Sequence, residues 1–390
     1  MAPPSKAPIK EKDLSGFKYF KILNPLLERL HDEGTQRDKA GNRKLFFDQY
    51  GSLLLLHFFS PIVDSLRSLQ QASGLGKVQK LLCGRHCSLG SLSEAQGVFR
   101  AESLQPLIQE LAQQALPLNK SHEAKLLADL TAVDGSLLRA LPQMAWALFQ
   151  DAQHRAVKLH LHFDVFKCVP CKATVTAGTA SEVEQLQQTF EAGRLYVFDR
   201  GYMCYSLYQT IIDRGASFVS RLRDNAVFEV LEERPLSAAD RAAGVFRDAL
   251  VLLGGDNPSN VLRQPVRLVW VNAGTARDGT PQTLVLVTNR LDLSAELIAL
   301  AYKYRWSIEL FFRWFKCILG CRHLVATSLN GVAIQLYLAL IASLLISVWV
   351  GKKPTKRTLE MLQFYFMGWA TEEELMQHID KLPDQPPAQE

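Results

Sequence analysis

Hydrophobic and polar positions follow two different rhythms along the chain. Up to about residue 120, apolar residues recur every three or four positions, as in residues 43–69, and this spacing predicts amphipathic helices. From about residue 124, short runs rich in β-branched residues alternate with helical segments, which is typical of an α/β protein. The pattern therefore predicts a helical N-terminal region followed by an α/β region.

The α/β region predicts the order strand, strand, strand, helix, strand, helix, strand. The segments behind this order are residues 125–136, 156–165, 171–178, 181–192, 194–201, 203–215 and 217–225. The next stretch, Ala226 to Leu297, carries strand-like runs of its own and ends before another helical segment. We expect this stretch to be a β-rich insertion.

The helical segment after the insertion, YKYRWSIELFFRWFK, places a few polar side chains among many apolar ones. On one continuous helix the polar positions fall within an arc of about 60°, and they are Tyr302, Arg305, Glu309 and Lys316. Most of the remaining circumference is apolar, which predicts burial. The segment therefore predicts a nearly buried helix that presents one carboxylate among cations.

A second apolar segment, residues 331–350, contains no charged residue. Its length and composition meet the criterion for a membrane-spanning helix. Gln335, Ser343 and Ser347 interrupt the run, and it is the only such segment in the sequence. We therefore interpret it as a buried core helix and expect no membrane partner.

Length and charge permit a globular protein with an anionic partner. The 390 residues are 48% hydrophobic, which is enough for several domains with their own cores. The net charge of +5 permits nucleic acid as a partner without requiring it. The first residues, MAPPSKAPIKEKD, lack the apolar stretch of a signal peptide, so we expect a cytoplasmic protein with reduced cysteines.

The cysteine spacing leaves a structural zinc site open as an alternative. Cys168 and Cys171 form a C-x-x-C pair just after two histidines, and further candidate ligands are His160, His162, Cys317, Cys321 and His323. Against zinc, the histidines alternate with apolar residues as in a strand, and CVPC fits a turn into the next strand. A second C-x-x-C pair is missing from the sequence.

Two aspartates occupy equivalent places at the ends of predicted strands. Asp134 closes the first strand in TAVDGS, and Asp199 closes the fourth in YVFDRGY. Strand ends of an α/β sheet are where ligands usually bind, although either acid alone would also suit a turn or a helix cap. Glu309 changes this balance, because a carboxylate among aromatic side chains is costly unless something pairs with it. A divalent cation would pair with all three.

Three carboxylates without Cys or His favour Mg²⁺ and phosphoryl transfer. Mg²⁺ takes hard oxygen ligands, and two such ions about 3.5–4 Å apart activate the attacking oxygen and steady the leaving oxygen. Arg305 and Lys316 would then hold backbone phosphates of the substrate. The alternative for Arg305 is an ion pair with Glu309 one helical turn away, on a solvated face.

These features resemble the DDE transposases of the insertion sequence 4 family. The resemblance rests on the strand order, on the acids in DGS and DRGY, on the insertion, and on the spacing Tyr302-x2-Arg305-x3-Glu309-x6-Lys316, and it covers residues 124–350. It implies a ribonuclease-H-like catalytic core with a β-rich insertion, and two Mg²⁺ ions, replaceable by Mn²⁺, held by Asp134, Asp199 and Glu309.

The resemblance also implies a reaction on double-stranded DNA in a homodimeric complex. Water would first liberate a 3′-hydroxyl at the end of a transposon bounded by terminal inverted repeats. That hydroxyl would then attack target DNA. Tyr302, Arg305 and Lys316 would contact DNA near the cleaved phosphate. Several relatives form a hairpin with a flipped base, for which Trp306 or Trp270 would be the stacking partner.

Further cationic and aromatic residues follow the predicted strands. Arg200 and Tyr202 come directly after Asp199, while Arg221 and Arg223 close the fifth strand. In a transposase these four would line the DNA channel. For the arginines, ordinary solvated charges at a strand end are an equal alternative.

The expected organisation has five parts. They are a disordered start at 1–15, a helical DNA-end-binding region at 16–120, a catalytic core at 124–225 and 298–350, the insertion at 226–297 and a helical tail at 351–390. Two other functions stay open: a metal-dependent nuclease of the same fold that does not join strands, and a non-catalytic DNA-binding protein. In a prokaryotic cell the expected location is the cytoplasm, on the nucleoid.

Overall fold

The computed structural model describes residues 27–31, 43–149, 151–254, 262–275, 281–319 and 324–383. The start at 1–15, which we expected to be disordered, lies outside these ranges. Contacts divide the chain into two compact units. One, which we call the sheet unit, comprises Asn119–Arg139 and Leu148–Phe312, and the other, the helical unit, comprises the described parts of Met1–Leu118, Ala140–Ala147 and Arg313–Glu390. The five-part division expected above stays a prediction.

The sheet unit contains a large mixed sheet with helices, as expected for an α/β protein. The described strands are β1 (Leu130–Arg139), β2 (Leu148–Phe149), β3 (Asp151–Asp164), β4 (Val169–Ala177), β5 (Leu195–Phe198), β6 (Ser217–Arg221), β7 (Phe228–Glu233), β8 (Val245–Leu253), β9 (Val266–Thr275) and β10 (Pro281–Thr288). β1 runs antiparallel to β3 and parallel to β5, and β5 runs parallel to β6. The five core strands therefore lie in the order β4, β3, β1, β5, β6.

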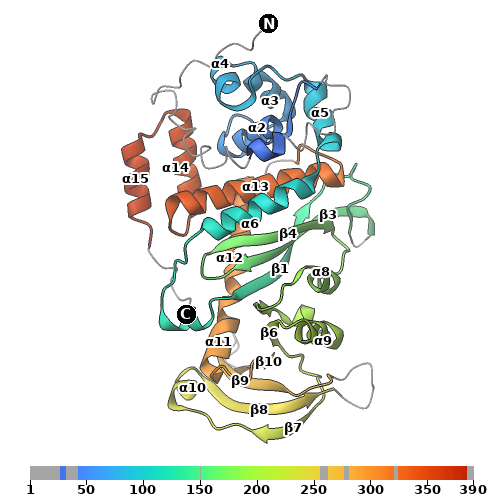
Figure 1. The fold of residues 1–390 in the computed structure, drawn as a ribbon, viewed down its shortest axis with the longest axis vertical. Coiled ribbons are helices and arrows are strands. Elements are labelled where there is room, and N and C mark those ends of the chain that lie inside the picture. Colours follow the sequence, from blue (N-terminus) through green and yellow to red (C-terminus); the bar gives the residue numbers. More distant parts are fainter. Residues whose placement is uncertain are drawn as a thin grey trace. The chain divides into compact units, whose positions relative to one another are not determined.

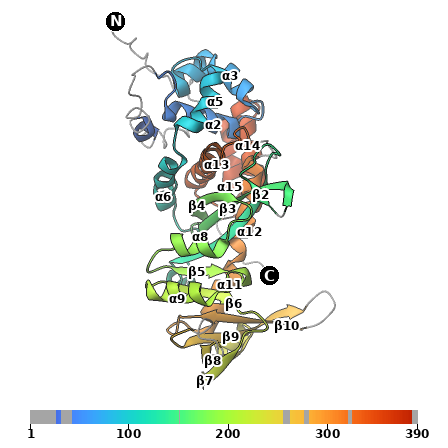
Figure 2. The same ribbon diagram turned by 90° about the vertical axis from the view of Figure 1, so that its right-hand side faces the viewer.

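The insertion continues this sheet instead of forming a separate one. β10 pairs antiparallel with β6, and β9, β8 and β7 follow outward in that order. Figure 2 shows these strands side by side beyond β6. The five core strands and the insertion are therefore joined by backbone hydrogen bonds as well as by the chain.

Helices cover both faces of the sheet. Those of the sheet unit are α7 (His122–Leu126), α8 (Glu182–Thr189), the 3₁₀ turn η5 (Arg200–Tyr202), α9 (Tyr205–Asp213), α10 (Ala238–Ala242), α11 (Ala295–Tyr304) and the start of α12 (Trp306–Leu319). α8 and α9 lie on one side of the sheet and α11 on the other (Figure 1). All four residues of β5 are buried, because both of its faces are covered.

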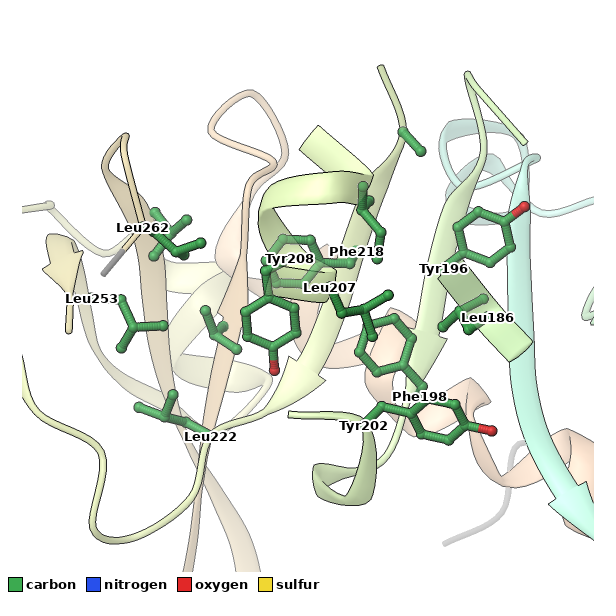
Figure 3. Close-up of a cluster of buried hydrophobic side chains, with 14 of the residues drawn as sticks. Leu186, Tyr196, Phe198, Tyr202, Leu207, Tyr208, Phe218, Leu222, Leu253 and Leu262 are labelled. Atoms are coloured by element: carbon green, nitrogen blue, oxygen red, sulfur yellow. The ribbon is translucent and has the colours of Figure 1, made fainter. Parts of the chain in front are cut away.

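The alternation of side chains along β1 and β5 shows which face of the sheet Asp134 and Asp199 occupy. Figure 3 shows the core under α8 and α9, with Phe198 of β5 beside Tyr202, and Val133 of β1 belongs to the same cluster. Neighbours along a strand point to opposite faces. Asp134 and Asp199 follow these residues directly, so both aspartates face the side covered by α11.

The helix expected at residues 302–318 is in fact two helices. α11 ends at Tyr304 and α12 starts at Trp306, with Arg305 in the turn between them, where its N–H donates to the carbonyl of Tyr302 at 3.0 Å. Apolar spacing is the same on both sides of the break, so periodicity alone does not reveal it. The break is one residue long, because Arg305 keeps helical backbone angles of φ −50° and ψ −36°, and its ion pair with Glu309 still spans one helical turn.

In the helical unit a long apolar helix is surrounded by shorter ones. The elements are α2 (Phe47–Phe59), α3 (Leu66–Ser73), α4 (Gly76–Val78), the π-helix η3 (Gln79–Cys83), α5 (Leu89–Val98), η4 (Ala101–Leu104), α6 (Gln105–Gln114), α13 (Leu329–Val350), α14 (Lys356–Met367) and α15 (Glu372–Asp380). α13 packs against α6, α2, α5 and η4.

Among the described residues, α13 is the one helix long and apolar enough to cross a membrane. However, 89% of its most apolar window is buried inside the protein. That burial agrees with our interpretation of residues 331–350 as a core helix.

Candidate active site

The first two acids lie side by side at the ends of parallel strands. Ala132 of β1 stands opposite Val197 of β5. Asp134 follows Ala132 by two residues and Asp199 follows Val197 by two, so both acids lie just beyond the last paired residues, and the charge of Asp199 acts on Asp134. Asp134 accepts a hydrogen bond from the N–H of Gly135 at 2.8 Å, and Asp199 accepts one from the N–H of Gly201 at 2.7 Å. The strand ends therefore bring the first two predicted acids near each other.

The electrostatics of Asp134 show which charges surround it. Burial raises its pKa to about 7, against a hydrogen bond from Gly135 that lowers it. The charges of Glu182 and Asp199 raise the pKa further, and that of Arg305 lowers it. A buried carboxylate with two acidic neighbours and one cation is a strained electrostatic arrangement that an added positive charge would relieve.

The third acid, Glu309, forms an ion pair with Arg305. Its Oε1 lies 2.7 Å from Nη1 of Arg305, and the two side chains keep 30% and 18% of their surface exposed. The ion pair that we weighed as an alternative for Arg305 is thus present, but it is half-buried and not on a solvated face.

Arg305 contacts two aromatic rings and lies near two of the three acids. Its guanidinium carbon lies 5.8 Å from the ring centres of both Tyr302 and Trp306. Burial lowers its pKa, but the hydrogen bond and charge of Glu309, with Tyr302 and Asp134, outweigh this effect, so the pKa is raised overall. Arg305 is therefore a permanent cation between Glu309 and Asp134.

Tyr302 joins the acids to a second arginine. Burial raises the pKa of its hydroxyl, the charges of Arg305 and Arg221 lower it, and that of Asp199 raises it. Tyr302 therefore lies within electrostatic range of Asp199, Arg305 and Arg221.

Two predicted residues of the segment from Tyr302 to Lys316 are more exposed than Arg305. Trp306 keeps 40% of its surface exposed. Lys316 is exposed on α12, two turns beyond Glu309, and falls in the helical unit. Trp270, the other predicted stacking residue, has Arg247 4.4 Å above its ring and Phe228 6.0 Å away, so that face of the ring is occupied.

Arg200 and Arg223 line a cavity of about 410 Å³ beside Asp199. Gly201, Asp224 and Asn225 complete its lining. Both arginines are exposed, and the backbone N–H of Arg223 donates to Met203 Sδ at 3.2 Å. The cavity carries two cations and one acid, which suits an anionic group such as a phosphate.

The position of Tyr202 disagrees with its predicted contact with DNA. It was predicted to line the DNA channel, yet only 1% of its surface is exposed and its ring stacks at 5.4 Å from Phe198 (Figure 3). Burial raises the pKa of its hydroxyl, and the charges of Glu182, Asp134 and Asp199 raise it further. A ring this buried has no surface for DNA, so Tyr202 supports the acids from the core side.

Glu182 is the residue that sequence analysis missed. It is the first residue of α8, where acids are common because they stabilise the positive end of a helix dipole. Its Oε1 lies 3.3 Å from Nζ of Lys158 on β3. Only the packing of α8 against β1 brings it to Asp134, and the sequence gives no signal of that.

The zinc alternative finds no support in the described residues. The thiol of Cys168 donates to the carbonyl of Val165 and that of Cys171 to the carbonyl of His162, both at 3.3 Å. His160 and His162 contact Thr176 and Thr189 at 2.8 and 3.0 Å. Cys321 and His323 lie outside the described residues.

Divalent cation binding depends on the carboxylates. In the part of the chain that the structure describes, no three His, Cys, Asp or Glu side chains are grouped tightly enough to hold a metal ion as they stand. The donor set is nevertheless hard oxygen, half-buried and electrostatically unsatisfied at Asp134, which fits Mg²⁺ or Mn²⁺. Oε1 of Glu309 is bonded to Arg305.

Comparisons with known proteins place this arrangement in a family. Residues 125–345 match the model of the transposase DDE domain. A protein named as a transposase in Sinorhizobium fredii is 30% identical over 240 residues, which are 61% of this chain and 65% of that protein. One named as the transposase for an insertion sequence element of Geobacillus stearothermophilus is 28% identical over 223 residues, 57% of this chain and 56% of that protein.

The chain thus spans less than two thirds of the length of these two relatives. Among solved structures it is similar to the piggyBac transposase synaptic complex with hairpin DNA, at 13% identity and a TM-score of 0.41, over 96% of this chain and 86% of that one. The family match covers more than half of the chain and includes Asp134, Asp199 and Glu309. This chain therefore belongs to the DDE transposases.

Proposed function

We propose that the protein cleaves the ends of an insertion sequence and joins the freed 3′-hydroxyl to target DNA. The observation that carries this proposal is the placement of Asp134 and Asp199 across neighbouring parallel strands, with Arg305 linking them to Glu309. Membership of the DDE transposases supports it.

Asp134, Asp199 and Glu309 would hold two divalent cations, Mg²⁺ or Mn²⁺. Such ions supply an activated attacking oxygen and stabilise the leaving oxygen of a phosphodiester. The raised pKa of Asp134, caused first by burial and then by its acidic neighbours, supports a site that needs added positive charge.

The remaining residues would hold DNA. Arg305 and Tyr302 would contact the phosphate beside the acids, and exchange of Arg305 from Glu309 to that phosphate would free the third acid. Lys316, Arg221 and Trp306 would extend the contact along the strand. Arg200 and Arg223 would take a neighbouring phosphate at their cavity.

The core strand order β4, β3, β1, β5, β6 supports a ribonuclease-H-like core, and the spacing from Tyr302 to Lys316 supports the insertion sequence 4 family. We propose that the protein acts as a homodimer on terminal inverted repeats, in the cytoplasm of a prokaryotic cell. Residues 16–120 would bind the transposon ends.

Joining of the cleaved DNA strand to target DNA distinguishes a transposase from a nuclease of the same fold. We would incubate the protein, Mg²⁺ and a supercoiled target plasmid with a labelled duplex that ends in the element's terminal repeat and a free 3′-hydroxyl. We expect covalent transfer of the label to the plasmid, which is lost with Asp199→Asn and kept with Asp213→Asn, an exposed acid at the end of α9. Cutting of the plasmid without joining would favour the nuclease.

A further inference from the structure

Glu182 lies against the backbone that carries the first acid. A Cβ on Gly135 would stand 2.6 Å from Oε1 of Glu182, closer than real side chains approach, so glycine leaves the room that this carboxylate fills. Gly135 follows Asp134 directly and donates its N–H to Oδ1 of that residue. The carboxylate of Glu182 therefore touches the peptide that orients Asp134.

The carboxylate is held in place by its surroundings. Lys158 on β3 approaches it to 3.3 Å and also donates to the carbonyl of Ala180 at 3.0 Å, just before α8. Burial raises the pKa of the Tyr202 hydroxyl on η5, and the nearby charge of Glu182 raises it further. An acid that merely started a helix would need neither partner. Here β3, α8 and η5 converge on one carboxylate beside β1.

The strand pairing explains why the Asp134 segment needs an additional contact. The register between β1 and β5 ends at Ala132 opposite Val197, so on that side Asp134 and Gly135 lie beyond the last paired residue. β3 still holds the other edge of β1, with Asp134 opposite Leu161. One edge of the Asp134 segment is therefore without a strand partner at the place where its position matters.

Resting on the function proposed above, we propose that Glu182 is a positioning residue of the acid centre. It braces the Asp134–Gly135 segment where β1 and β5 part, and so fixes the carboxylate of Asp134 beside that of Asp199. Gly135 is small because Glu182 occupies the space of its side chain.

The test couples Glu182 to Gly135. Glu182→Ala removes the brace, and Gly135→Ala displaces it while the chain still folds, because the atom in the way is the far end of a flexible side chain. Each single variant should lower the rate of DNA end cleavage by about 10- to 100-fold, as loss of an outer partner of a metal ligand does. The double variant should be no slower than Glu182→Ala, because the new methyl group then meets empty space.

A second readout does not depend on cleavage. Mn²⁺ binding to the DNA-free protein, followed by the paramagnetic resonance signal of the free ion, should weaken by about tenfold in both single variants. The control is Glu184→Ala, an exposed acid in the same first turn of α8, which should leave both readouts within about twofold of wild type.

Three outcomes would overturn the inference. Additive effects in the double variant would mean that Gly135 and Glu182 act separately, and Glu182→Ala behaving like Glu184→Ala would mean that Glu182 only starts its helix. A wild-type protein that neither binds Mn²⁺ nor cleaves DNA would instead remove the proposed function, and the inference with it. Intact wild-type activity with unchanged Glu182 variants removes the inference alone.

Discussion

Arg305 shows how one side chain links the parts of the acid centre. It bonds Glu309 at 2.7 Å, contacts two aromatic rings and lowers the pKa of Asp134 through its charge. Guanidinium groups suit this role, because their fork of donors serves a carboxylate and a phosphate with fixed geometry. Lysine carries the same charge without the fork.

Arg305→Lys should therefore weaken binding to a transposon end by about tenfold, which is about 1.4 kcal/mol. Fluorescence anisotropy with a labelled terminal repeat at fixed salt would measure it. The control is Lys303→Ala, an exposed cation on α11 two residues away. Unchanged binding by Arg305→Lys would mean that Arg305 contributes its charge alone, because lysine keeps that charge.

At the scale of elements, a buried ion pair fixes the insertion to the start of α11. Arg267 on β9 and Asp248 on β8 are 2% and 3% exposed, with Nη2 and Oδ2 2.6 Å apart. Arg267 also donates to the carbonyl of Leu293, just before α11. The pair therefore holds two insertion strands and the helix that carries Tyr302.

Asp248→Ala should lower the free energy of unfolding by about 3–5 kcal/mol, because it leaves a buried cation without its partner. Denaturant unfolding followed by circular dichroism would measure the loss. Glu233→Ala breaks the exposed pair with Arg247, next to Asp248 on β8, and should change stability little because solvent screens that pair. If the two variants lost the same stability, burial would not be the cause.

Strand and helix order could be predicted from the sequence, because each run is decided by residues close together in the chain. Asp134, Asp199 and Glu309 could be proposed for the same reason, since each is marked by its own local pattern, and their role stays a prediction. The turn at Arg305, the joining of the insertion to β6 and the approach of Glu182 to Gly135 depend on contacts between distant segments. Local hydrophobic periodicity does not predict such contacts.

At the scale of the whole molecule, buried histidines make stability depend on pH. His162 is fully buried beside Thr189 and Tyr196, and burial lowers its pKa to about 3. Its ordinary pKa in an unfolded chain is about 6.5, so protons favour the unfolded state between these values. Stability from this residue is complete above about pH 6.5 and is lost as the pH falls towards 3.

His162→Gln should remove this dependence, at about 1.4 kcal/mol per pH unit between pH 6 and 4. Asp134 acts in the opposite direction, because its raised pKa stabilises the folded protein as the pH falls. The quantity to measure is therefore the difference in unfolding free energy between wild type and variant across this range. A difference that does not change with pH would contradict the account of His162.

The central claim is that Asp134, Asp199 and Glu309 form one cation-dependent centre that cuts DNA. The most direct measurement incubates the protein and Mg²⁺ with a plasmid carrying the gene and its native flanking DNA, and maps new 3′-hydroxyl ends with Glu309→Gln in parallel. We predict breaks at the edges of an inverted repeat that disappear in the variant and on removal of Mg²⁺. Breaks that persist in Glu309→Gln would contradict the assignment of the third acid.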